Sequence, residues 1–187
     1  MSWIEEIDVD DAGKELASIY ASLLEKRGKI ANVFRVQSLN PASMQEHLDL
    51  YITLMFGESG LSRLEREAVA VVVSANNECV YCVNHHAAAL SNYVEDQETL
   101  DMLCAADGLE TLEPRLSNIV RHAEKLTSAP SAMTEIDLGE LRAVGLSDRD
   151  ILDLTQIVAY FSFVNRLVLG LGVESAPNEA YGYRTEP

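Results

Sequence analysis

Apolar residues recur every three or four positions along most of this chain, which is the spacing of one face of an α-helix. A glycine after an apolar stripe marks a helix end, as at Gly28. Asn or Ser before a stripe marks a helix start, as at Asn40-Pro41 and Ser62. A short apolar connector is expected at residues 30–36. The pattern predicts an all-α protein, with helices at about 10–27, 40–57, 62–75, 78–93, 97–106, 114–127, 135–143 and 147–171.

The run Ala68–Ala75 is apolar on every side, which predicts a buried helix. Its valines would also suit a strand, but Ser62 and Glu65 form the pattern of a capping box and favour a helix. The next helix is expected to begin near Glu78. Cys79 would then lie in its first turn, where free N–H groups and the helix dipole favour a thiolate.

A short internal repeat suggests how the chain is organised. Gly60-Leu61-Ser62 recurs as Gly145-Leu146-Ser147, and in the second copy apolar residues stand where the first has its cysteines. We therefore expect one domain over residues 1–187, built from two related helical units at about 41–107 and 114–173. The polar residues from Glu174 onwards are expected to form a tail that is ordered by a partner subunit.

The length and charge of the chain limit the classes of function that it can have. The chain has 187 residues, enough for one compact core, and a formal net charge of −16. That charge repels phosphate groups, so nucleic acid and anionic membrane surfaces are not expected partners. The N-terminus lacks the pattern of a secretory leader, and the apolar stretch 157–171 is too short and polar to span a bilayer, which together predict a cytoplasmic protein. Arg166 interrupts that stretch and is expected to form an ion pair with another helix or subunit.

Two of the three cysteines and two of the four histidines fall in one segment, Cys79-Val-Tyr-Cys82-Val-Asn-His85-His86. On a helix Cys82 and His86 share a face, and Cys79 lies one turn earlier. A Cys-x-x-Cys pair beside an imidazole suits reversible thiol chemistry, in which one sulfur attacks, the second resolves and a base accepts the proton.

Other interpretations of these residues remain open. Cys79, Cys82 and a histidine could bind zinc, although ligands on one helix turn make a poor tetrahedron. The cysteine pair could also have no functional role. Covalent haem attachment is excluded because Val83 stands where that motif requires histidine, and a thioredoxin fold would need flanking strands. His85 suits a structural role as well as a catalytic one. Cys104 is expected to be a buried apolar residue, and His47 and His122 surface or packing residues.

The spacing Glu67-x11-Cys79-x2-Cys82-x3-His86 resembles the core motif of alkylhydroperoxidase D, within the carboxymuconolactone decarboxylase superfamily. The surrounding segment Leu61–Leu90 is similar to that superfamily's peroxidase-related subgroup. Ala31-Asn-Val-Phe-Arg35 and Phe161-Ser-Phe-Val-Asn-Arg166 are similar to the subgroup's flanking blocks. The resemblance covers most of the chain and implies an all-α fold that assembles as a homo-oligomer, a dimer, trimer or hexamer.

The resemblance also implies roles for individual residues. Cys82 would be the nucleophile that attacks a hydroperoxide, and Cys79 would resolve the resulting sulfenic acid as a disulfide. His86 would relay the proton, with Glu67 holding its imidazole. No metal or flavin cofactor is implied, and a dithiol protein of lipoyl or thioredoxin-like type would supply the electrons.

The sequence departs from the family at one position. The best-known members carry histidine between the two cysteines, where this chain has Tyr81. Tyrosine can donate a hydrogen bond to substrate but is a poor base near neutral pH. With His85, Tyr81 is therefore a supporting candidate for the site. The sequence predicts a thiol-dependent peroxidase for organic hydroperoxides; the alternatives are a decarboxylase-like enzyme and a non-enzymatic redox sensor on the same fold.

Overall fold

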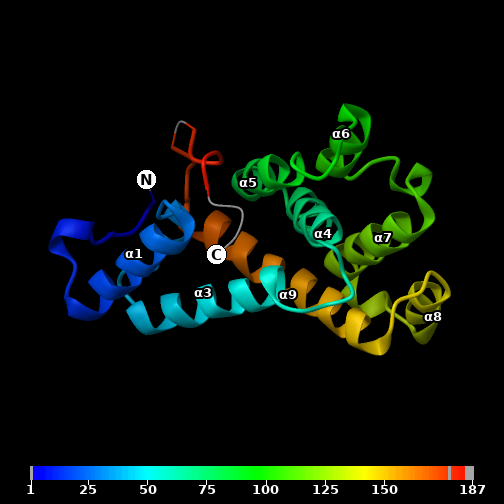
Figure 1. Ribbon diagram of the computed structural model, residues 1–187, viewed down its shortest axis with the longest axis horizontal. Helices are drawn as coiled ribbons and strands as arrows, with labels where there is room; N and C mark the ends of the chain where they lie inside the picture. Colours follow the sequence, from blue (N-terminus) through cyan, green and yellow to red (C-terminus); the bar gives the residue numbers. More distant parts are fainter. Residues whose placement is uncertain (1, 177, 184–187) are drawn as a thin grey trace.

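The computed structural model describes residues 2–176 and 178–183, and over these residues the protein is helical, without strands (Figure 1). The prediction of an all-α fold is confirmed. The α-helices of the described chain are α1 (Lys14–Arg27), α2 (Asn32–Arg35), α3 (Pro41–Phe56), α4 (Arg63–Asn76), α5 (Val80–Leu90), α6 (Gln97–Ala105), α7 (Pro114–Ser128), α8 (Glu135–Ala143) and α9 (Asp148–Leu171).

The helices differ from the sequence-based expectation in three regions. Helix α1 begins at Lys14, because Val9–Asp11 forms a separate 3-10 turn. The connector at 30–36 contains the short helix α2. Helix α5 begins later and ends earlier than expected, so Cys79 is its N-cap residue and does not lie in its first turn. The late start is caused by Glu78, whose φ of 56° turns the chain sharply between α4 and α5.

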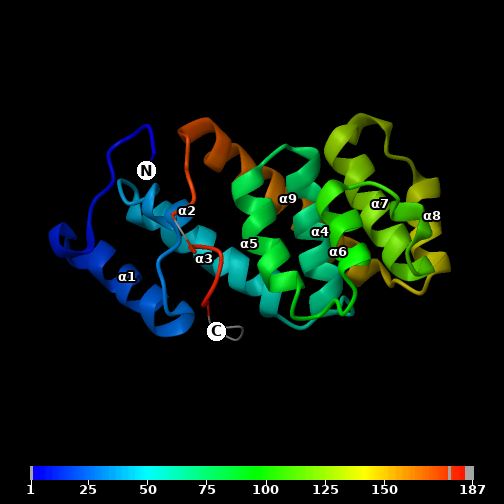
Figure 2. The same cartoon turned by 90° about the horizontal axis from the view of Figure 1, so that it is seen from above.

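Helix α4 lies at the centre of the molecule and packs against α5, α7 and α9 (Figures 1 and 2). Every side chain from Ala68 to Ser74 is fully buried, as the apolar run predicted. The capping box of Ser62 and Glu65 is present, with Glu65 N–H donating to the Ser62 hydroxyl and Ser62 N–H to the Glu65 carboxylate. Helix α4 therefore holds its side chains in fixed positions along its length.

The second long core helix is α9, which contacts α3, α4, α7 and α8. By length and composition alone it could cross a membrane, since it extends well before the 157–171 stretch considered in the sequence. Inside the fold 44% of its most apolar window is buried, and Leu154, Ile157 and Phe161 of this helix belong to the main hydrophobic core. Asn165 is fully buried on this helix, whereas Arg166 is exposed and donates to the Ser162 carbonyl at 2.7 Å. Arg166 forms no ion pair with another helix among the described residues, so that part of the expectation is wrong; an ion pair with another subunit stays a prediction.

Both copies of the Gly-Leu-Ser repeat stand at the start of a core helix. Ser62 caps α4 and Ser147 caps α9, each in a capping box. The two starts are linked, because Gly60 N–H donates to the Asp150 carboxylate at 2.9 Å. A Cβ at Gly60 would collide with that carboxylate, which explains the glycine. The division into two related units over 41–107 and 114–173 stays a prediction.

The end of the described chain folds back over the protein's own surface, between α1–α2 and α5 (Figure 2). Glu179 is buried there and accepts hydrogen bonds from the backbone and the side-chain amide of Asn32, both at 2.8 Å. The expectation that this tail needs a partner subunit for order is wrong for residues 178–183. Residues 177 and 184–187 lie outside the described part of the chain.

Candidate active site

The two motif cysteines are brought together at the start of α5. Their sulfur atoms lie 2.9 Å apart and share a hydrogen bond, and both residues are free cysteines. Cys79 is fully buried, and Cys82 is 2% exposed. Only Cys82 of the two lines the large cavity described below. The pair is therefore placed to share one proton and to form one bond.

The hydrogen bond between the sulfurs makes the two thiols unequal. It lowers the pKa of Cys79, against the opposing effect of burial. It raises the pKa of Cys82, as burial does. The side chain of Asn165, on α9, lowers the pKa of both thiols by hydrogen bonding. One negative charge on the pair is therefore stabilised, whereas a second is strongly disfavoured.

The imidazole of His86, one helix turn after Cys82 on α5, is paired with a carboxylate of α4. His86 Nδ1 lies 2.7 Å from the Glu67 carboxylate, which is fully buried on α4. The other carboxylate oxygen accepts from Arg63 at 2.5 Å. Arg63 also donates to the Met55 carbonyl and stacks over the Phe56 ring, 3.9 Å from guanidinium carbon to ring centroid. The buried carboxylate thus has a cation on one side and the imidazole on the other, which fixes the ring's orientation.

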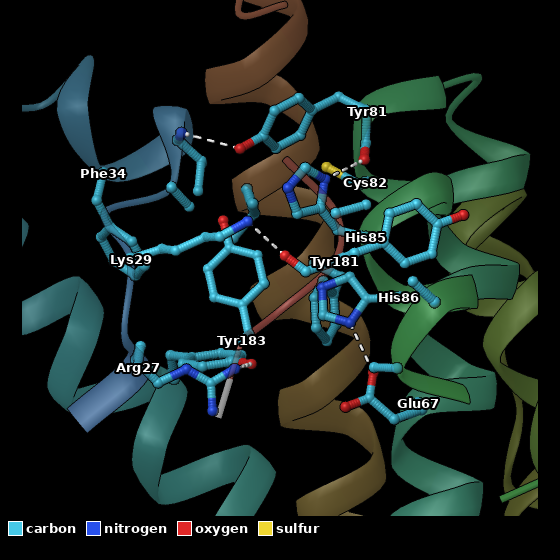
Figure 3. A pocket seen from close by; sticks show the side chains of 18 of the residues that line it. Arg27, Lys29, Phe34, Glu67, Tyr81, Cys82, His85, His86, Tyr181 and Tyr183 are labelled. Carbon is cyan, nitrogen blue, oxygen red and sulfur yellow. Dashed lines mark hydrogen bonds and ion pairs between the residues drawn. The ribbon is translucent and has the colours of Figure 1, made fainter. Parts of the chain in front are cut away.

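A cavity of about 340 Å³ opens beside Cys82 and His86 (Figure 3). This volume is in the range of a small-molecule site. One side is formed by α4 and α5. The opposite side is formed by the end of α1, the following loop and the closing segment, a name we give to residues 178–183. Aromatic rings line much of the space between them, from Phe34, Tyr51, Tyr160, Phe161, Tyr181 and Tyr183.

Tyr81, which stands in place of the family's histidine, holds the closing segment. Its hydroxyl donates to the Glu179 carboxylate at 2.6 Å and accepts from the Val33 N–H at 3.2 Å. The Tyr81 ring stacks on His85, with centroids 4.2 Å apart, and His85 Nε2 lies 3.6 Å from the same carboxylate. Burial raises the pKa of Tyr81, and the Glu179 carboxylate raises it further, so the phenol stays protonated as a donor.

The other residues considered in the sequence are placed as follows. His47 is buried rather than on the surface, and its ring bonds to Tyr160 at 2.7 Å and to the Gln37 side chain. Burial lowers the pKa of His47 to about 4, so it is neutral. His122 is also buried, away from the thiols on α7. Cys104 is half-buried and packs against the cluster around α6 and α7.

Several residues of this site carry no sequence signal that pointed to them. Glu179 and Arg27 come from the two ends of the described chain, and nothing in their local pattern relates them to Cys82. Arg63 could have been inferred, because it precedes Glu67 by one helix turn. Within the described residues no group of three or more His, Cys, Asp or Glu side chains is placed to hold a metal ion. The zinc alternative thus finds no third ligand there.

The site and the fold match known proteins. The profile of the carboxymuconolactone decarboxylase family matches residues 42–125, which include the whole motif. One similar solved structure is an alkylhydroperoxidase AhpD core, an uncharacterized peroxidase-related protein from Ralstonia eutropha. It is 27% identical to this chain and superposes with a TM-score of 0.85. The match covers 95% of this chain and 94% of that one. A peroxidase-related protein from Silicibacter sp. is 31% identical, covers 92% of this chain and 91% of its own, and has a TM-score of 0.82.

A match to a larger protein is weaker. Sestrin-3 of Mus musculus is 23% identical over 162 residues, or 84% of this chain. This chain spans only about a third of Sestrin-3, 32% of its length. The Silicibacter protein, 31% identical over nearly the whole chain, and the family profile together establish the family of this chain. The chain belongs to the carboxymuconolactone decarboxylase family, among its alkylhydroperoxidase D-like, peroxidase-related members.

Proposed function

We propose that this protein is a thiol-dependent peroxidase that reduces organic hydroperoxides through a dithiol–disulfide cycle of Cys79 and Cys82. The observation that carries the proposal is the pair of free sulfurs 2.9 Å apart at the wall of an aromatic cavity, beside the His86–Glu67 pair. The membership of a family that includes enzymes supports catalysis, and the peroxidase-related relatives support this type of reaction.

The cycle starts with one thiolate on the pair. In the resting arrangement the inner sulfur, Cys79, carries the charge more easily, so transfer of the shared proton moves the charge to Cys82 at the cavity. The Cys82 thiolate attacks the terminal oxygen of the hydroperoxide. The S–O bond forms as the O–O bond breaks, and the alkoxide leaves and takes a proton through His86, which Glu67 orients.

The second half of the cycle closes the disulfide. The Cys79 sulfur attacks the sulfenic sulfur of Cys82, the S–S bond forms and the hydroxyl leaves as water with the Cys79 proton. The hydroperoxide has then gained two electrons and become an alcohol, and the two thiols have lost them. An external dithiol returns both electrons and both protons. We propose a lipoyl or thioredoxin-like protein for this step, a cytoplasmic location and a homo-oligomeric assembly.

The decisive experiment counts thiols and turnover together. Reduced protein receives one equivalent of cumene hydroperoxide, and its thiols are titrated before and after. We expect two of the three thiols to disappear and peptide mapping to show a Cys79–Cys82 disulfide. With excess dihydrolipoamide, peroxide consumption should continue over many equivalents. A reaction limited to one equivalent would instead support a redox sensor.

Single substitutions test which catalytic role each sulfur has. Cys82→Ser should abolish the reaction with peroxide, whereas Cys79→Ser should stop after one turnover with a sulfenic acid on Cys82 that dimedone traps. Cys104→Ser is the matched control and should keep full turnover, because Cys104 lies in a different cluster. Full peroxide turnover in both motif variants would overturn the proposal, because the reaction would then not use these thiols.

A further inference from the structure

Arg27 lies across the cavity from Cys82 (Figure 3). It is the last residue of α1, and its guanidinium is surrounded by aromatic rings. The guanidinium carbon lies 5.7 Å from the ring centroid of Tyr51, 5.1 Å from that of Phe56 and 5.8 Å from that of Tyr183. These contacts hold the side chain in place but leave its N–H donors in need of acceptors.

Those donors are poorly satisfied within the described chain. Nη2 reaches only the Tyr51 hydroxyl, at 3.5 Å, and Nη1 is buried with no hydrogen-bond partner among the residues described. The other cations of the cavity are occupied. Arg63 is paired with Glu67, and Lys29 donates to the backbone carbonyls of residues 178 and 181. A guanidinium nitrogen that is shielded from water and lacks an acceptor is costly, and a planar anion that accepts hydrogen bonds from both Nη atoms would relieve that cost.

The charge of the cavity points the same way. The chain as a whole has a net charge of −16, yet among the described residues that line the cavity Arg27, Lys29 and Arg63 face one carboxylate, that of Glu67. The lining is therefore positive in an otherwise acidic protein, and its walls of low polarity strengthen the field inside. An anionic small molecule would be drawn to this space although the rest of the surface repels it.

We propose that Arg27 is the anion-binding end of the substrate site, and that the preferred substrates are organic hydroperoxides with a carboxylate at the end opposite the –OOH group. The carboxylate pairs with Arg27, an apolar or aromatic body packs among the rings of the cavity, and the –OOH group meets Cys82. This inference rests on the proposed function for the identity of the reacting group, but the carboxylate site itself does not depend on turnover.

A matched substrate pair tests the inference. The substrate 4-(2-hydroperoxypropan-2-yl)benzoate has a carboxylate opposite its –OOH group, and its methyl ester has the same body without charge. We expect the wild-type protein to favour the carboxylate by about tenfold or more in kcat/KM, the size of a charge-assisted hydrogen-bond contribution. Arg27→Met should reduce this ratio to about one. Lys26→Met, which removes an equal charge from an exposed neighbour outside the cavity, should leave the ratio unchanged.

Binding without chemistry separates this inference from the proposed function. Calorimetry with 4-isopropylbenzoate, which carries no peroxide, should show binding that its methyl ester lacks and that Arg27→Met abolishes. Should turnover fail while this binding pattern holds, the carboxylate site stands and the peroxidase proposal falls. If turnover proceeds with equal preference for acid and ester in both proteins, the inference is overturned and the peroxidase proposal stands. Arg27→Lys, which keeps the charge but loses the planar fork, should bind several-fold more weakly and serves if the methionine variant does not fold.

Discussion

The two sides of the cavity are built in different ways. The motif side, formed by Glu67, Cys82 and His86, comes from two consecutive helices, α4 and α5. The opposite side, formed by Arg27, Lys29 and the closing segment, joins the end of α1 and the loop after it to the region after α9. Helix spacing fixes the motif side, whereas the opposite side forms only when distant parts of the chain meet. We therefore expect substitutions on the motif side to affect chemistry, and those on the opposite side to affect stability and substrate choice.

The largest effect is expected at Glu67. Glu67→Gln keeps the shape of the side chain but removes the charge that faces His86 and Arg63. Because the imidazole then loses its anionic partner, proton transfer to the leaving alkoxide should slow, and kcat/KM for cumene hydroperoxide should fall by about a hundredfold. Stopped-flow kinetics across the pH range measures the rate and the change in its pH profile.

Glu65→Gln is the control for that experiment. Glu65 is also a buried carboxylate of α4, but it caps the helix and pairs with Arg115 at 2.6 Å, away from the sulfurs. Its loss should reduce stability and spare the rate. Equal rate losses in both variants would mean that Glu67 acts only through the fold.

An intermediate effect is expected at Glu179, on the opposite side. Although burial raises its pKa, His85, Tyr81 and the N–H groups of Asn32 and Ala176 together lower it to about 2. The folded state therefore binds this proton less readily than the unfolded state. The contribution of Glu179 to the free energy of unfolding is therefore fully present above its ordinary pKa of about 4.5, and it is lost as the pH falls from 4.5 towards 2.

Glu179→Gln should remove that contribution. At pH 7 we expect the free energy of unfolding to fall by about 1.5–3 kcal/mol, which is the size of hydrogen bonds to a charged group. Between pH 4.5 and 2 the variant should lose less stability than the wild-type protein does. Urea unfolding across this range measures both. Glu174→Gln, at an exposed position near the closing segment, should match the wild-type protein; a similar loss there would show a general charge effect.

The smallest effect is expected at His47, which reaches the cavity from α3 between the two sides. Its pKa is lowered by burial to about 4, so the folded state keeps it neutral while the unfolded state takes up a proton below about pH 6.5. The wild-type protein should thus lose about 1–2 kcal/mol through this group between pH 7 and pH 5. In His47→Gln this loss should disappear, although the variant is less stable at pH 7. An unchanged pH slope would show that His47 takes up a proton as readily in the folded protein as in the unfolded chain.

This difference between the sides also explains what could be predicted from the sequence. The all-α fold, the buried α4 and the grouping of Glu67, Cys79, Cys82 and His86 all depend on residues near one another on helices, where spacing sets position. The start of α5 was missed because the positive φ of Glu78 makes a local turn that overrides helical periodicity there. Glu179 could not be found, since a polar residue near a chain end has the same local pattern whether it is exposed or, as here, buried against Tyr81.

The depth of the sulfurs sets a steric condition on whatever regenerates them in the proposed cycle. Cys79 is enclosed and Cys82 shows only 2% of its surface, so a flat protein face could not bring a thiol into line with either atom. A donor would have to send a slender, flexible arm down the passage between the aromatic rings. That geometry favours a lipoyl group on its long lysine tether over a thioredoxin-like fold, whose reactive cysteines lie close to its own surface.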